Sequence, residues 1–187
     1  MTKQIANIEV ERVEIGPSVF SARLPDAAEV AQQFLTQALN YSVDRMGWKQ
    51  AEPLAEAVRR NASALAFFRY SLAEQTARYI GSLDENIKSI HYYDDDGVSE
   101  DVGDQPGTST CQIHLVAWVS RRTDALQSLA AALNRALATA CMNTFDCFPT
   151  IHILDLQVAD DEDVRQRVGY GALLTSIHNA PLEIWQR

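Results

Sequence analysis

The sequence predicts an α+β fold in which a mainly antiparallel sheet carries helices on one face. Side chains at 110–120 alternate between two sets, one of them apolar throughout, which is typical of a strand. Residues 26–83 instead place apolar side chains at helical spacing. Further patterns give the order strand, two helices, strand, strand, helix, strand, helix. This order is a variant of the split βαβ (ferredoxin-like) fold, with a helical hairpin in the first crossover.

The first strand is expected at residues 4–15. Apolar and polar side chains alternate from residue 6 to residue 11, so the polar face carries Asn7, Glu9 and Glu11. The parity of the apolar positions changes after residue 11, which indicates a β-bulge.

The helical hairpin is expected over residues 26–83, between the first and second strands. Asp26 begins its first helix as part of a capping box, and Gly47 follows that helix as a C-terminal cap. Pro53 suits the first turn of a second, longer helix, which is expected to end at Gly81.

The second and third strands are expected at 86–94 and 110–120, and they pair across an acidic loop rich in Gly and Pro. Thr123 then caps a third helix, whose buried stripe is mostly leucine and whose many alanines allow close packing. Because both faces of the last strand, at 150–158, are apolar, we expect it in the centre of the sheet or covered on both sides. The split βαβ order places the first strand between this last strand and 110–120.

The C-terminal residues 160–187 are expected to form a helical extension. An acidic run at 160–163 begins a short helix, and a second helical turn follows at 172–178. Residues 181–185 form an apolar tail that is expected to dock on the rest of the protein. The whole chain, 1–187, is predicted to be a single α+β domain.

Composition narrows the class of protein. With 187 residues, 47% of them hydrophobic, the chain can bury a substantial core. The net charge of −9 argues against binding of nucleic acid or of an anionic membrane surface. Cys111, Cys141 and Cys147 are read as reduced thiols, so we expect a cytoplasmic protein. The acidic charge is common in soluble proteins of bacterial type. The N-terminal residues alternate between apolar and polar side chains, unlike a signal peptide, and no apolar run is long enough to span a membrane.

Three histidines in three predicted strands, His91, His114 and His152, raise the question of a metal site. Zinc requires ligand nitrogens at about 2.1 Å. With strands about 4.8 Å apart, one intervening strand would separate the backbones of His114 and His152 by about 10 Å. We therefore expect hydrogen-bonded histidines in a half-buried sheet and no metal.

Other candidate motifs fail on spacing. The run 94–97 resembles a calcium loop, but Tyr92 and Gly103 would then occupy positions that require carboxylates. Cation binding by the acidic loop 94–104 stays open. Residues 169–171 lack the third glycine and the lysine of a phosphate loop. The spacing also indicates no catalytic triad or Cys-His pair, so we predict no cofactor and assign no catalytic residue.

The sheet face turned away from the helices is the predicted functional surface. Its candidate residues are Glu9, His91, Gln112, His114 and Trp118. A face with this aromatic content is too apolar for ordinary solvated surface.

Two interpretations of this face compete. In the first, a second copy covers it, and the protein is a non-catalytic, self-associating binding or accessory module, a homodimer. In the second, the face around His114 and Trp118 holds a small organic ligand, with His114 and Glu9 as proton-transfer groups. This second interpretation describes a small-molecule-binding protein or an enzyme. The acidic charge disfavours single-stranded nucleic acid as a third occupant.

Overall fold

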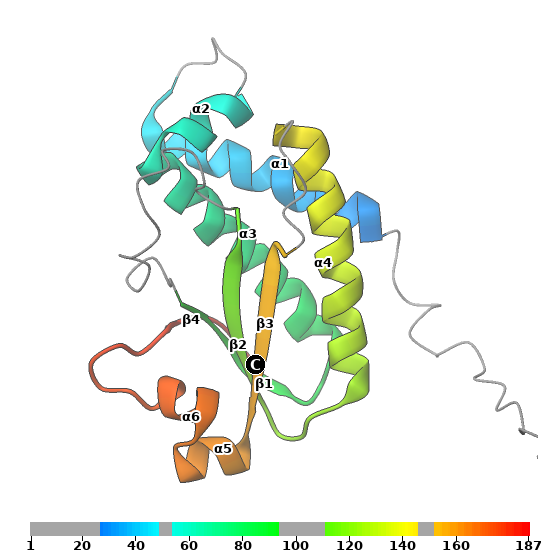
Figure 1. Cartoon of the computed structure of the whole chain (residues 1–187), viewed down its shortest axis with the longest axis vertical. Coiled ribbons are helices and arrows are strands. Elements are labelled where there is room, and N and C mark those ends of the chain that lie inside the picture. Colours follow the sequence, from blue (N-terminus) through cyan, green and yellow to red (C-terminus); the bar gives the residue numbers. More distant parts are fainter. Residues whose placement is uncertain (1–26, 49–53, 94–110, 146–151) are drawn as a thin grey trace, which may run out of the picture.

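The computed structural model describes residues 27–48, 54–93, 111–145 and 152–187 (Figure 1). Its strands are β1 Ile87–Tyr93, β2 Ile113–Val119, β3 Leu154–Asp160 and β4 Leu182–Gln186. In the described part of the chain they form a four-stranded sheet in the order β3-β2-β1-β4. β1 is antiparallel to both β2 and β4, whereas β2 and β3 are parallel. The fold is therefore α+β, as predicted.

The expectation of a mainly antiparallel sheet is wrong, because the sheet is mixed. The helix between β2 and β3 returns the chain along the length of the sheet, so β3 runs in the same direction as β2. β3 also pairs directly with β2, and the expected intervening strand is not between them. The predicted first strand at 4–15 and the acidic loop 94–104 lie outside the described residues.

The helices before β3 are α1 Ala27–Met46, α2 Leu54–Arg60, α3 Ala62–Leu83 and α4 Asp124–Phe145 (Figure 1). α3 and α4 pack on the sheet, and α1 and α2 pack on these two helices. The expected long second helix is divided in two at Asn61, whose backbone is extended and whose side chain accepts from the Ala64 N–H at 3.0 Å. Gly47 follows α1 with a φ of 66°, as predicted for a C-terminal cap. Thr123 caps α4 through the Leu126 N–H at 3.3 Å, also as predicted.

The core lies between this helical layer and the odd-numbered face of β2. Ile113, Leu115, Ala117 and Val119 are fully buried, which confirms the predicted parity. They belong to the same buried cluster as Phe68 of α3, while the leucines of α4 close the cluster from another side. The alternation that predicted the strand therefore arises from burial against α3 and α4.

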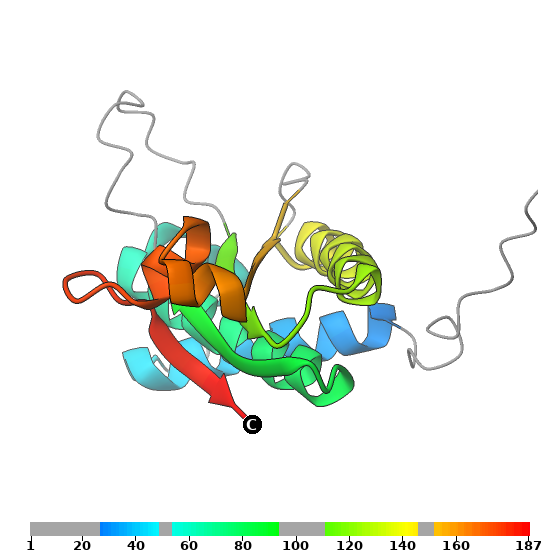
Figure 2. The ribbon, with the colours of Figure 1, turned by 90° about the horizontal axis from the view of Figure 1, so that it is seen from below.

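Two short helices, α5 Asp161–Gln166 and α6 Gly169–Leu174, lie on the opposite side of the sheet from α1 and α3 (Figure 2). The expectation that the helices lie on one face of the sheet is therefore wrong. Asp160 and Asp163 form the capping box that begins α5. A Cβ at Gly171 would lie 2.2 Å from the Asp163 carbonyl oxygen, so α5 and α6 pack backbone against backbone.

The C-terminal tail does dock, but as a strand, so the extension 160–187 is not wholly helical. β4 pairs with β1, and the indole of Trp185 covers Gly81 of α3. Gly81 does not end α3, which continues to Leu83; a Cβ at this position would lie 2.5 Å from the indole. Arg187 donates to the carbonyl oxygens of Gly81 at 2.9 Å and of Asp84 at 3.1 Å. In the described part of the chain, no helix is long and apolar enough to cross a bilayer.

Candidate functional site

Three neighbouring strands bring Tyr93, His114 and Asp155 together on the sheet face away from α3. Tyr93 of β1 lies opposite His114 of β2, and His114 lies opposite Asp155 of β3. Because strand side chains alternate, all three project from the same face. The direct pairing of β2 with β3 is therefore what gives His114 a carboxylate partner.

The Asp155 carboxylate is the centre of this cluster. Its Oδ2 lies 3.0 Å from His114 Nδ1 and accepts a hydrogen bond from the Tyr93 hydroxyl at 3.4 Å. Its Oδ1 accepts from Gln157 Nε2 at 2.6 Å. The side chains of His114 and Asp155 are 20% and 30% exposed, so the pair is shielded yet reachable from solvent. We refer to Tyr93, His114, Asp155 and Gln157 as the His114 cluster.

The hydrogen bond to Asp155 fixes how the His114 imidazole is presented. A carboxylate accepts from Nδ1–H, so in the neutral ring the lone pair is on Nε2. No described residue hydrogen-bonds to Nε2. A histidine oriented by a carboxylate, with the second ring nitrogen available, can exchange a proton with a bound molecule.

Tyr93 is held as a neutral phenol. Burial, followed by the negative charge of Asp155, raises the pKa of its hydroxyl far above the ordinary value. Its ring lies 5.3 Å from the His114 ring and 6.5 Å from the Tyr170 ring of α6, measured between centroids. Tyr93 and Tyr170 thus form an aromatic wall beside the imidazole.

His91 projects from the same face but is not part of this cluster. Its Nε2 lies 2.9 Å from the Ser89 hydroxyl, and the Glu183 carboxylate of β4 is 3.9 Å away. Nδ1 is buried without a hydrogen-bond partner among the described residues. Burial lowers the pKa of His91, although Glu183 opposes this shift. His91 is a half-buried side chain whose lowered pKa favours the neutral form, rather than a second proton carrier.

Trp118 lies further along the same face and is half-buried against α5. Its indole N–H donates to Asp161 at 2.8 Å, and Lys88 Nζ lies 5.2 Å from the ring centroid. Lys88 also bonds to Asp161 at 2.6 Å. The α5–α6 segment of the same chain therefore occupies part of the face that the sequence was taken to leave open.

The remaining predicted positions do not meet the cluster. Gln112 is half-buried and precedes β2, and Glu9 lies outside the described residues. His152 is exposed and precedes β3, so the expectation that it lies within a strand is wrong. Among the described residues, no group of three or more His, Cys, Asp or Glu could hold a metal ion.

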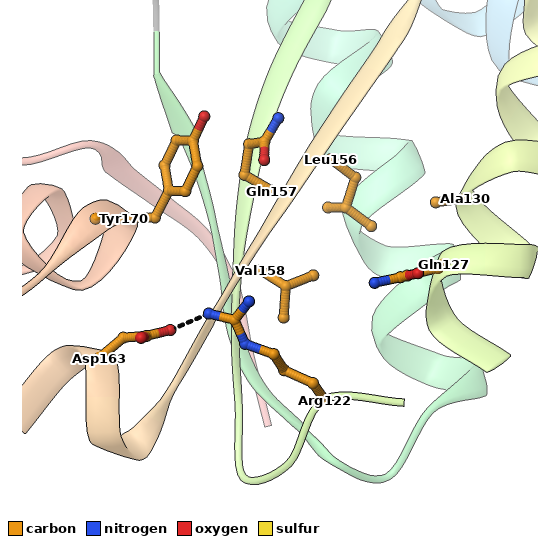
Figure 3. Close-up of a pocket in the computed structure, with 9 residues that line it drawn as sticks. Arg122, Gln127, Ala130, Leu156, Gln157, Val158, Asp163 and Tyr170 are labelled. Atoms are coloured by element: carbon orange, nitrogen blue, oxygen red, sulfur yellow. Dashed lines mark hydrogen bonds and ion pairs between the residues drawn. The ribbon is translucent and has the colours of Figure 1, made fainter. Parts of the chain in front are cut away.

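A pocket of about 350 Å³ adjoins the cluster at the outer edge of β3 (Figure 3). Gln127 and Ala130 of α4 lie on one side of the strand, and Tyr170 and Asp163 lie on the other. Gln157 lines this pocket and also donates to Asp155. Arg122 crosses the end of β3 and pairs with Asp163 and, at 3.1 Å, with Asp160.

Sequence reasoning found His114 but missed Asp155, Gln157 and Tyr170. A charged residue within the run TIHILDLQV was the available signal for Asp155. That Asp155 lies beside His114 follows only from the pairing of their strands, and the periodicity of a single strand does not predict this pairing. Comparison of the chain with known protein families, with curated proteins and with solved structures found no match.

Proposed function

We propose that this chain is a small-molecule-binding protein, in which the His114 cluster recognises a polar organic ligand. The observation that supports this proposal is the 3.0 Å contact of His114 with Asp155, beside Tyr93 and Gln157. Such a pair presents Nε2 of His114 as a hydrogen-bond acceptor or a base. A ligand with one acidic O–H or N–H group and a flat or apolar body would suit the imidazole and the aromatic wall of Tyr93 and Tyr170.

The test is a titration of the purified protein with metabolite mixtures, followed through Trp118 fluorescence and the NMR signal of the His114 ring. We expect a ligand to shift the His114 signal and His114→Gln to weaken binding at least about tenfold, the cost of one lost hydrogen bond to a polarised group. His178→Gln is the matched control, because His178 is exposed and no hydrogen bond, ion pair or ring contact joins it to the described residues of the His114 cluster. Binding that survives His114→Gln would remove the proposal.

Self-association is a second candidate function, supported by a different observation. The exposed large apolar side chains of the described residues all lie in the C-terminal segment: Val168, Tyr170, Ile177 and Leu182. Ile177 is 92% exposed. Apolar side chains gathered in one exposed segment are typical of an interface, so a homodimer would bury this segment.

Sedimentation velocity separates the two functions. A homodimer through this segment predicts dimer in the wild type and monomer in Ile177→Glu, because the glutamate would be desolvated in the interface. A wild type that stays monomeric at roughly 100 μM, above most specific dissociation constants, would exclude self-association. Ligand binding at His114 is unaffected by that result.

We also propose a cytoplasmic location. Cys111 and Cys141 are buried and hydrogen-bonded to each other. A reducing compartment keeps such a pair as thiols.

A further inference from the structure

The outer edge of β3 presents backbone groups that no described strand pairs with. The Ile113 N–H donates to the Ile153 carbonyl at 2.7 Å, which fixes the direction of every β3 backbone group. Alternate residues bond to opposite neighbours, so Asp155 and Gln157 face β2, whereas Leu156 and Val158 face outward. Each outward residue offers one N–H and one carbonyl.

Side chains close this edge at both ends but not in the middle. The side-chain oxygen Oδ1 of Asn134 in α4 accepts a hydrogen bond from the outward Leu154 N–H at 2.9 Å. The Asp163 carboxylate accepts from the Asp160 N–H at 3.1 Å. No described residue hydrogen-bonds to the backbone of Leu156 or Val158 between these caps. The N–H and carbonyl groups of these two residues are thus left at the centre of an edge whose two ends are capped.

The pocket lies over this central part of the edge (Figure 3). Leu156 and Val158 form its floor with Ala130 on the α4 side, where the Gln127 amide also lines the pocket. Gln157, Tyr170 and Arg122 supply polar groups on and around the other side. A slot that offers backbone groups along an apolar floor, with polar groups around it, fits an extended strand better than a compact ligand.

We infer that residues 4–15 of this chain occupy the slot as a fifth strand paired with β3. These residues lie outside the described residues, and their sequence alternates between apolar and polar side chains. Ala6, Ile8 and Val10 would face the same side as Leu156, Val158 and Ala130. Asn7, Glu9 and Glu11 would face the same side as Gln157 and Tyr170. The pairing would satisfy the four ladder groups and remove an exposed sheet edge, which is otherwise a site of aggregation.

The connecting residues are long enough for this arrangement. Residues 16–26 join the proposed strand to α1, and 11 extended residues span up to about 36 Å. α1 packs against α4, and α4 packs against β3. A helix is about 10 Å wide, so the connection can pass around α4 to the β3 edge.

Amide hydrogen exchange of the full-length, ligand-free protein tests the inference. We expect the Leu156 and Val158 amides to exchange slowly in the wild type and at least about tenfold faster in Ile8→Pro, because proline removes a ladder donor and an apolar contact. Ser21→Pro, in the connection, is the matched control and should leave both amides slow. The Leu115 amide, which bonds to β3 within the sheet, reports that the sheet is intact.

If Ile8→Pro loses protection at Leu115 as well, Val158→Pro replaces it. Proline at 158 removes only an outward N–H, and it should speed exchange of the residue 6–10 amides while Leu115 stays protected. The inference is overturned if Leu156 and Val158 exchange freely in the wild type, or stay slow in Ile8→Pro. Protection that grows with protein concentration would assign the edge to a second copy and overturn it too. None of these outcomes depends on ligand binding at His114.

Discussion

His91 and His114 are two half-buried histidines on one sheet face whose chemistry differs because their partners differ. His114 contacts a carboxylate at 3.0 Å and keeps one ring nitrogen free of described partners. His91 contacts a serine hydroxyl, and its side chain is 13% exposed. The partner and the solvent access, rather than the residue type, separate a candidate proton carrier from a structural side chain.

His91 should make the folded state sensitive to acid. Burial lowers its pKa in the folded protein below the unfolded value of about 6.5, so the unfolded chain binds more protons as the pH falls. The stability that neutral His91 contributes is therefore fully present above about pH 6.5 and is lost as the pH falls below that value. Urea unfolding at pH 7.5 and pH 5 should show a smaller loss for His91→Gln than for the wild type. An equal loss in both proteins would contradict the assignment of His91 as a buried neutral group.

Asp155→Asn should lower the pKa of Tyr93. Burial raises that pKa first, and the Asp155 charge raises it further, so a neutral amide removes the second cause while leaving the first. NMR of ring-labelled tyrosine would show Tyr93 ionising at lower pH in the variant than in the wild type. Asp44→Asn, at an exposed position on α1, is the control and should leave Tyr93 unchanged. An unchanged Tyr93 titration in Asp155→Asn would mean that the two side chains are not in contact.

At the scale of elements, β4 shows how side-chain contacts fix a short C-terminal strand. Trp185 lies on Gly81 of α3, and the Arg187 guanidinium lies 5.7 Å from the indole centroid while it bonds to backbone carbonyls. The glycine gives α3 a flat surface at the point where the strand crosses it. A five-residue strand gains little from its ladder alone, so this contact secures it.

Gly81→Ala should destabilise the protein by about 1–3 kcal/mol, although alanine is the better helix former by about 1 kcal/mol. The new Cβ would lie 2.5 Å from the indole, so Trp185 must move. Urea unfolding measures the loss, and near-UV circular dichroism detects the displaced indole. Ser82→Ala, on the exposed side of the same turn, should change stability by less than about 0.5 kcal/mol. A Gly81→Ala protein more stable than the wild type would show that the indole yields without cost.

The elements that were predicted correctly are those whose pattern is local. The fully buried odd-numbered positions of β2 and the leucine stripe of α4 reflect burial by a single neighbour layer, which one segment records by itself. β4 was taken for a docking tail because its pairing depends on β1, far earlier in the chain. The parallel pairing of β3 with β2 was missed for the same reason, and with it Asp155 as the partner of His114. The candidate site shows the same division: His114 was predicted from its own strand, whereas its carboxylate partner Asp155 was not.

At the scale of the whole molecule, acidic side chains outnumber basic ones. The chain carries 25 acidic and 16 basic side chains, for a net charge of −9. Near the sheet, some of the excess is offset where Arg122 pairs with Asp160 and Asp163 and Lys88 pairs with Asp161. These pairs are partly exposed, and such pairs contribute only about 0–1 kcal/mol each. Repulsion among the remaining acidic groups acts over the entire surface and favours the expanded, unfolded chain.

Salt should therefore stabilise the folded protein. Raising NaCl from 10 mM to 150 mM shortens the Debye length from about 30 Å to about 8 Å, which screens repulsion between distant carboxylates more than it weakens contacts of a few ångströms. We expect the free energy of unfolding from urea titrations to rise by about 1 kcal/mol at pH 7. Lys88→Met, which makes the net charge −10 and removes one ion pair, should increase this salt dependence. A fall in stability with salt would show instead that the ion pairs around α5 outweigh the general repulsion.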